Sequence, residues 1–313
     1  MASVMGDVHH MSQDIGTIIN KGFSTWTRNL NISLPFILNF GISGLLALIA
    51  FAAFVVIFVM PELSSMGLDP ANILPEQMLS ILSSAVGDHI MLIIAGFIIF
   101  MILIMFIQSY FIAGAIGMSK IATETGDTYL NDMLSYGNRN VVNLFLINIL
   151  LALIMLAGIV FIVPGILSME NFNMFLSNPE ETAASSVLFA FGFLAWMLYI
   201  LVASIVLSIV KYVLVVDDLD PITALETGFR FFIGNKLDIL LMWLILISIS
   251  VFVGIIGEGI SLVPIISTIW IFTDIVISIA VIPPLTTIWW TRLYLSRTGR
   301  NMYDVDELLD NLY

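Results

Sequence analysis

The chain has 313 residues, of which 60% are hydrophobic and only 11% are charged. Soluble domains carry about 25% charged residues, so this composition predicts a protein that lies in lipid. The net charge of -13 argues against a nucleic-acid partner, because such a partner requires a basic face. The chain contains no cysteine, which excludes disulfides, thiolate metal sites and cysteine nucleophiles.

Six apolar stretches are long enough to cross a bilayer, which takes about 20 residues in a helix. Backbone groups in lipid must be hydrogen-bonded within their own segment, so stretches of this length are helices rather than barrel strands. The predicted spans are 36–60, 90–116, 141–164, 186–213, 237–256 and 264–290. A further surface helix is predicted in the outer loop, around 75–86.

All lysine and arginine residues fall on one side of these spans. They lie before span one, between spans two and three, from the inner end of span four to span five, and after span six: Lys21, Arg28, Lys120, Arg139, Lys211, Arg230, Lys236, Arg292, Arg297 and Arg300. By the positive-inside rule this side is cytoplasmic. We therefore expect a multi-pass protein of the cell membrane with both termini in the cytoplasm.

A short amphipathic stretch that ends near an asparagine precedes each odd-numbered span. The first ends near Asn29. The third opens with Asp220 and Pro221, a helix N-cap followed by proline at the first helical position, and ends at Asn235. The second is weaker and leads to Asn140. We interpret the three asparagines as residues that end surface helices.

This pattern predicts a threefold repeat. Aligning Asn29 with Asn235 also places Gly22 opposite Gly228, although the second copy lacks the matching Gly-Phe pair. The predicted unit is a cytoplasmic surface helix, an asparagine turn and a transmembrane hairpin. Its three copies cover roughly 10–126, 127–217 and 218–299. Alternatively, the few matched residues reflect only the periodicity of helices that commonly precede spans.

The expected fold is thus a single all-α integral membrane domain. Its six transmembrane helices form three hairpins, each preceded by a cytoplasmic amphipathic helix. An acidic tail, 300–313, follows the last span. Anionic lipid headgroups would repel this tail, so we expect it to dock on the basic loops of the protein or on a partner.

Two groups of residues resemble a known family. One is the acidic turn and helix VVDDLDPITAL, residues 215–225, which leads to Gly-Asn-Lys at 234–236. The other comprises Pro283, Pro284, Thr291, Tyr294 and Arg297. They resemble uncharacterised prokaryotic, largely archaeal, six-helix membrane proteins related to the membrane domain of some glycerophosphodiester phosphodiesterases. The resemblance implies the fold, but it implies no catalytic or binding residue, because that membrane part has no agreed activity.

Residues for catalysis are missing from the predicted spans. The sequence GISG at 41–44 fits the pattern of rhomboid proteases, but their serine needs a histidine at depth. The only histidines are His9, His10 and His89. Small residues at 41–44 therefore indicate close helix packing. The chain also lacks nucleotide-binding and metalloprotease motifs, and the pair His9 and His10 is too small a ligand set. We expect no enzyme activity, no cofactor and no metal site.

Asp274 is the one acidic residue well inside a predicted span. It lies about ten residues into span six, hence about 15 Å deep. Such a carboxylate is costly in lipid and usually faces the protein interior or a water-filled cavity. It is therefore a candidate proton, ion or ligand site. Alternatively it is protonated, or it bonds across helices to polar side chains such as Asn39, Gln108 or Asn148.

Two functions remain open on the sequence. The first is a non-enzymatic membrane subunit or scaffold that engages lipid, or another membrane or cytoplasmic protein. The second is a transporter or permease-like protein with Asp274 in its pathway. A polar cavity that reaches Asp274 would favour transport, whereas an exposed apolar groove on a packed bundle would favour the subunit. The sequence does not indicate the oligomeric state.

Overall fold

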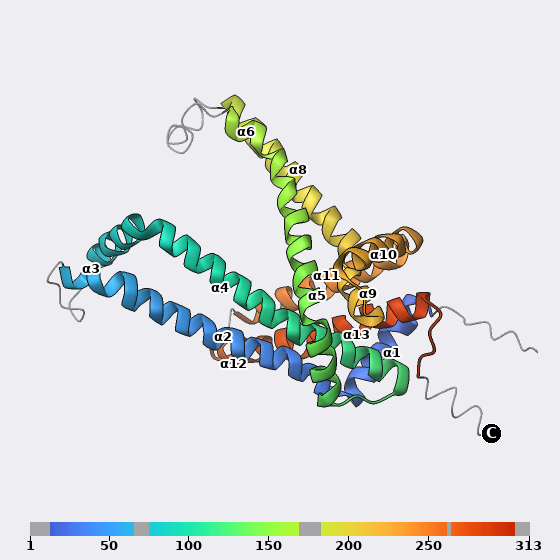
Figure 1. Cartoon of the computed structure of the whole chain (residues 1–313). Coiled ribbons are helices and arrows are strands. Elements are labelled where there is room, and N and C mark those ends of the chain that lie inside the picture. The colour runs from blue at the N-terminus through green and yellow to red at the C-terminus, as the bar shows by residue number, and fades with distance from the viewer. Residues whose placement is uncertain (1–12, 66–74, 169–182, 262–263, 304–313) are drawn as a thin grey trace, which may run out of the picture.

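The computed structural model describes residues 13–65, 75–168, 183–261 and 264–303, and all regular secondary structure in these ranges is helical (Figure 1). Six helices in them are long and apolar enough to cross a membrane, which confirms the predicted number. We refer to them as candidate spans one to six. They are Leu30–Ser65, His89–Thr125, Leu130–Phe161, Ser186–Asp217, Lys236–Ile260 and Ile266–Arg297.

In chain order the first elements are α1 (Ile15–Arg28), η1 (Leu30–Ser33), α2 (Leu34–Phe54), η2 (Val55–Val59), α3 (Met60–Ser65) and α4 (Pro75–Thr125). The helix predicted around 75–86 is present as the first part of α4. The backbone departs from helical geometry at His89, with φ -120° and ψ 16°, and so kinks the helix where candidate span two begins.

The remaining elements are α5 (Leu130–Ala157), η4 (Gly158–Phe161), α6 (Val163–Leu167), α8 (Ala183–Leu207), α9 (Val210–Asp217), α10 (Pro221–Gly234), α11 (Lys236–Ser261), α12 (Pro264–Val276), η5 (Ile277–Val281) and α13 (Ile282–Arg297). Candidate span six is divided into α12, the π-helical η5 and α13. Pro283 and Pro284 stand at the break, where their missing N–H groups remove backbone hydrogen bonds.

Helices α1 and α10 share one local design. Each has 14 residues and an aspartate N-cap, Asp14 or Asp220, with extended backbone. Hydrogen bonds from Thr17 and Thr223 to these aspartates hold the pKa of each carboxyl below its usual range. The helices end at their C-cap residues, Asn29 and Asn235.

The structure corrects the helix-ending role predicted for Asn140. Helix α5 continues from Leu130 to Ala157, so Asn140 lies within it. Its amide donates to the carbonyl of Tyr136 (3.3 Å) and to Oδ1 of Asp218 (3.2 Å), in the turn after α9. Asn29 and Asn235 lie at the same distance from the N-cap residue of their helices. The residue at that distance from the N-cap of α5 is Leu144, which is fully buried. An apolar side chain there offers no cap, and the helix runs on.

The buried core lies where candidate spans two, four and six meet at the ends that carry the basic residues, here called the inner ends. Six of the eight residues of α9 and twelve of the 16 of α13 are buried. The last turns of α4 contact both helices. Elsewhere few residues of the spans are buried. In the most apolar 18-residue window of each, between 0 and 17% of the residues are buried.

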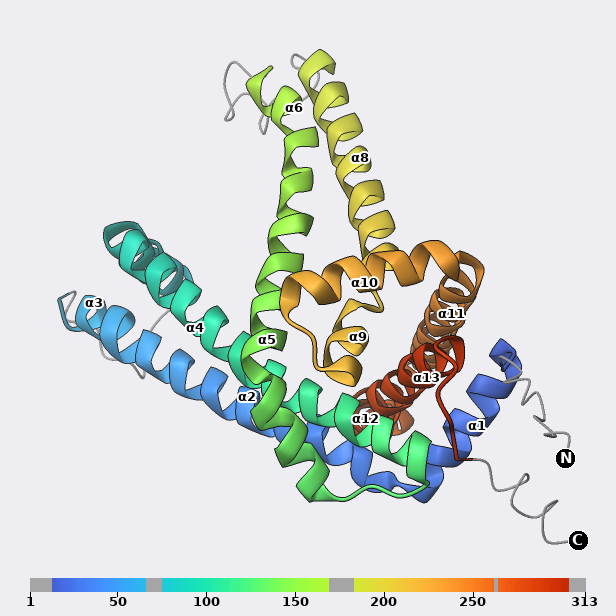
Figure 2. The same ribbon diagram turned by 45° about the vertical axis from the view of Figure 1, so that its right-hand side comes forward.

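The helices leave this core in different directions. Figures 1 and 2 show α2 beside α4, and α5 beside α8, as two pairs that diverge from the inner ends. Helix α13 lies close to the start of both pairs, next to α1 and α9 (Figure 2). The outer parts of these pairs therefore present apolar side chains on most of their surface.

One glycine in each of α1, α10 and α5 lets helices approach closely at the inner ends. A Cβ atom at Gly22 of α1 would lie 2.4 Å from the side chain of Trp289 on α13. At Gly228 of α10 it would lie 2.7 Å from Val210 on α9. At Gly137 of α5 it would lie 3.0 Å from the ring of Tyr110 on α4. Each glycine is the eighth residue after the N-cap of its helix.

The small residues at 41–44 do not have this role. A Cβ atom at Gly41 or Gly44 would meet no atom within 4 Å, so the close helix packing predicted there is wrong. The reason is that α2 lies beside its neighbours without a tight crossing at this level, and its surface there is mostly exposed.

Replacing Gly22 with alanine should destabilise the protein, because the added methyl would force Trp289 out of its place between α1 and α13. Overpacking of this kind costs about 1–3 kcal/mol. Thermal unfolding in detergent should show a lower midpoint for Gly22→Ala. The matched control, Gly44→Ala, should keep or raise the midpoint, since alanine favours helix and meets open space there. Equal midpoints for the two variants would contradict the close contact.

Candidate functional site

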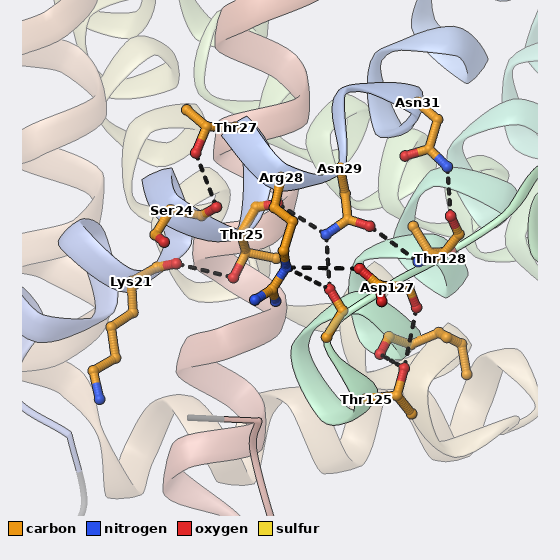
Figure 3. A network of polar contacts seen from close by, with 12 residues as sticks. Lys21, Ser24, Thr25, Thr27, Arg28, Asn29, Asn31, Thr125, Asp127 and Thr128 are labelled. Atoms are coloured by element: carbon orange, nitrogen blue, oxygen red, sulfur yellow. Dashed lines mark hydrogen bonds and ion pairs between the residues drawn. The ribbon is translucent and has the colours of Figure 1, made fainter. Parts of the chain in front are cut away.

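A buried asparagine joins α1 to the turn between α4 and α5. The amide of Asn29 donates to the carbonyl of Gly126 at 2.9 Å and to that of Thr25 at 3.1 Å. Its Oδ1 accepts the backbone N–H of Thr128 at 3.0 Å, and Arg28 also donates to the Gly126 carbonyl (Figure 3). Gly126 has φ +100°, a left-handed conformation that glycine adopts without strain.

The inner ends of α4, α9 and α13 are joined by charged groups. Arg300 donates to Asp217 and lies 3.8 Å from a carboxylate oxygen of Glu124. The hydroxyl of Tyr294 donates to the other oxygen of Asp217. Lys120 donates to the carbonyl of Val216 at 2.9 Å. These contacts form the inner polar layer of the protein.

Helix α13 is also fixed to residues before α1 and to α11. Arg292 is buried at 1% exposure and donates to Oε1 of Gln13 at 2.9 Å. Arg297 donates to the carbonyl of Gln13 at 2.7 Å and to Asp238 at 2.6 Å. Both arginines therefore join α13 to Gln13, and Arg297 also joins it to α11 through an ion pair.

A polar cavity of about 620 Å³ lies between α2, α4, α9 and the junction of η5 with α13. Its lining mixes amide and hydroxyl groups with aromatic and aliphatic side chains. The polar part includes Asn39, Ser43, Gln108, Ser278, Thr286 and Thr287. Its charged residue is Lys211, and no carboxylate lies among the described residues that line it. The cavity can therefore offer one cation and several hydrogen-bonding groups to a bound molecule.

Lys211 differs from the arginines around it. Arg139, Arg297 and Arg300 each form an ion pair with a carboxylate. Within the described ranges, Lys211 has no carboxylate at ion-pair distance, and its Nζ lies 5.2 Å from the ring centre of Tyr212. It stands six residues before Asp217, which places it about 9 Å along the helix from the inner polar layer.

The structure places Asp274 outside this cavity. It is partly exposed on α12, one helical turn before the lining residue Ser278, and is not itself part of the lining. Among the residues that the structure describes, it forms no hydrogen bond or ion pair. Asn39 and Gln108, two of its expected partners, line the cavity instead. The third, Asn148, donates to Oγ of Ser109 at 3.0 Å.

Sequence reasoning missed Lys211 as a site residue, because a lysine near the end of a span can extend its amine to the interface. A signal was nonetheless present. The residues four positions away on either side, Leu207 and Val215, are apolar, so the helix itself supplies no counter-charge. The cavity joins residues from four separate segments, and no local pattern brings these together.

A second cavity, of similar size, is almost entirely apolar. It lies between α5, α8 and α10 and is lined by residues such as Tyr199, Ile222 and Phe229, with Glu226 at its side. In the part of the chain that the structure describes, no group of three histidine or acidic residues is placed to hold a metal ion. His9 and His10, and the acidic tail beyond residue 303, lie outside the described residues.

Comparison with known proteins identifies the family. The model of the family described as "Domain of unknown function (DUF7847)" matches residues 42–293, most of the chain, and the chain belongs to this family. An uncharacterized protein of Archaeoglobus fulgidus is 24% identical over 308 residues, which cover 92% of this chain and 97% of that protein. No solved structure matches the chain.

These matches confirm the resemblance to an uncharacterised family with an archaeal member. They do not link the chain to the membrane domain of glycerophosphodiester phosphodiesterases, so that part of the resemblance gains no support. Neither match names a ligand, partner or activity.

Asn29 and Asn235 offer a matched test of the network in Figure 3. With the described residues, the side chain of Asn29 forms three hydrogen bonds, two of them to the turn after α4 (Figure 3), whereas that of Asn235 donates only to the carbonyl of Phe231 within its own helix. A net hydrogen bond is worth about 1 kcal/mol. Asn29→Ala should therefore lower the free energy of unfolding by about 2 kcal/mol more than Asn235→Ala does.

This difference can be measured by denaturant unfolding of the purified protein in detergent. Similar losses in the two variants would mean that both asparagines act only as helix caps.

Proposed function

We propose that this member of the DUF7847 family is a non-enzymatic, multi-pass protein of the cell membrane that serves as a membrane subunit or scaffold, engaging lipid or a partner protein. The observation that carries the proposal is the small burial of the six apolar helices, at most 17% of the residues in their most apolar windows. So large an apolar surface requires lipid or another protein to cover it.

The proposed topology is three transmembrane hairpins with both termini in the cytoplasm. The arrangement of charge supports it. The arginines of the inner polar layer gather at one end of the long helices, as the positive-inside rule requires of a cytoplasmic side. Helices α1 and α10, which are amphipathic, pack at that same end.

A threefold repeat is part of the proposal, with its second copy realigned. Counting from the N-caps places Gly137 opposite Gly22 and Gly228, and each of these glycines allows a close helix contact. The turns after candidate spans two, four and six supply a second sign. Gly126, Asp218 and Gly299 are the residues with positive φ in the described part of the chain, and each follows the inner end of its span. A relation to the phosphodiesterase membrane domain rests only on residues 215–236 and on the group Pro283, Pro284, Thr291, Tyr294 and Arg297.

Transport is the alternative, and the polar cavity beside the broken span six favours it. The scaffold is the better proposal because Asp274 is not on the cavity wall, and because an apolar cavity of similar volume lies beside α10.

If Asp274 serves a pathway, Asp274→Asn should abolish transport of a substrate and leave the thermal unfolding midpoint unchanged. A variant that shows only a lower midpoint would assign Asp274 a structural part.

The absence of cysteine makes the topology directly testable. Single cysteines can be introduced at two exposed serines, Ser24 of α1 and Ser64 of α3. In intact cells a membrane-impermeant maleimide should label Ser64→Cys and not Ser24→Cys, which should react only after permeabilisation. Labelling of both, or the reverse pattern, would overturn the proposed topology.

The subunit proposal predicts what accompanies the full chain in mild detergent. Native mass spectra of the protein purified from its own membrane should show a stoichiometric second protein, or lipid that stays bound. A bare monomer that instead moves a solute across vesicle membranes would replace the scaffold with the transporter.

A further inference from the structure

We propose that the cavity lined by Lys211 binds the phosphate group of an anionic membrane lipid. The proposal deepens the lipid engagement of the proposed function and rests on it in one respect, the placement of the spans in a bilayer. The cavity itself, with its residues and volume, is a feature of the folded chain.

Charge is the first argument. Within the described residues Lys211 has no carboxylate at ion-pair distance, although it lies among helices that are mostly apolar. A cation in such surroundings is costly, and a bound anion offsets the cost. Lys120, the other lysine packed into the inner ends, already donates to a backbone carbonyl. Lys211 is the cation left to face an open cavity.

Hydrogen-bonding capacity is the second argument. The amides of Asn39 and Gln108 and the hydroxyls of Ser43 and Thr286 line the same cavity as the Lys211 ammonium. Ammonium, amide and hydroxyl groups are all donors, and a phosphate carries several oxygens that accept from them. These residues come from α2, α4, α9 and α13, so the fold brings the donors together from four segments.

The shape and lining favour a lipid over free phosphate. A volume of about 620 Å³ is within the usual range of small-molecule sites and far exceeds one inorganic anion. The same lining also includes apolar side chains, among them Phe36, Phe40, Ile104 and Ile282. Phe40 is also 56% exposed on α2, so the lining continues onto the apolar surface of that helix. A headgroup at Lys211 with its acyl chains along α2 would fill both parts.

The depth of Lys211 in the membrane is a further argument. Lys211 lies about 9 Å along the helix from the inner polar layer. The headgroup region of one leaflet is about 5–8 Å thick, so an ammonium at the end of a long lysine stem can reach the phosphates of the cytoplasmic leaflet. A phosphate held there would need no passage across the hydrocarbon core.

The test is a lipid titration of the full chain in mild detergent, followed by native mass spectrometry. The probes are phosphatidylglycerol, which is anionic, phosphatidylcholine, which has no net charge, and inorganic phosphate. We expect one phosphatidylglycerol to be retained in preference to phosphatidylcholine. Lys211→Gln should weaken its binding about tenfold, as expected for the loss of one charge-assisted hydrogen bond. Lys211→Arg should keep most of the affinity.

Lys236→Gln is the matched control. Lys236 is an exposed lysine at the start of α11 and does not line the cavity, so its loss removes the same charge without touching the site. It should leave phosphatidylglycerol binding unchanged. Gln108→Leu provides a second variant in case Lys211→Gln fails to fold. It keeps the charge, removes one amide from the cavity, and should weaken binding severalfold.

The outcomes separate the sources of the phosphate. Displacement of the lipid by inorganic phosphate, lost in Lys211→Gln, would support the phosphate site and assign it a soluble ligand. Unchanged phosphatidylglycerol binding in both Lys211→Gln and Gln108→Leu would overturn the site, and equal retention of phosphatidylcholine would overturn its preference for anionic lipid. Because the titration is done in detergent, its result is independent of the maleimide labelling that tests the topology.

Discussion

The burial of α13 is the constraint on which the rest of this structure depends. The helix carries tryptophan, tyrosine and arginine side chains into a region where α1, α4, α9 and α11 converge, so each of these polar groups must find a partner there. Those partners are what hold the inner ends together. Trp289 donates to a carbonyl of α1, Tyr294 to Asp217, and Arg297 to Asp238. These contacts place α1 and α13, which are far apart in the sequence, side by side.

The long helices can diverge because the contacts that hold them together are concentrated at their inner ends. Contacts between α4, α9 and α13 fix the inner ends, whereas the outer parts of the spans pack only in pairs, α2 with α4 and α5 with α8, and bury few of their residues. In water such a surface would drive aggregation, but lipid tails are as apolar as the side chains and so impose no penalty. The same arrangement leaves Lys211 and the amides of Asn39 and Gln108 around a cavity rather than in contact with one another. The candidate site and the divergent helices are therefore consequences of one packing arrangement.

The inner polar layer also bears on the choice between scaffold and transporter. Transport by alternating access requires bundles that move against one another about a site near the middle of the membrane. Here the ends of α4, α9 and α13 are joined by Arg300, and α11 is joined to α13 by Arg297. Such cross-links favour a rigid inner end. The polar cavity lies close to that end, which suits a lipid bound in the leaflet at that end better than a central substrate.

The sequence by itself determined the features whose causes are local. The number of long apolar helices follows from the length of each run, and the caps of α10 follow from Asp220, Pro221 and Asn235, which act on their own backbone. Only the tertiary structure decided the rest. Asn140 has the sequence context of a helix end, yet it lies inside α5 and bonds to Asp218 across the core. Lys211 resembles an ordinary lysine near a span end until α2, α4 and α13 surround it, because a cavity is defined by segments distant in sequence, whose contacts no local pattern encodes.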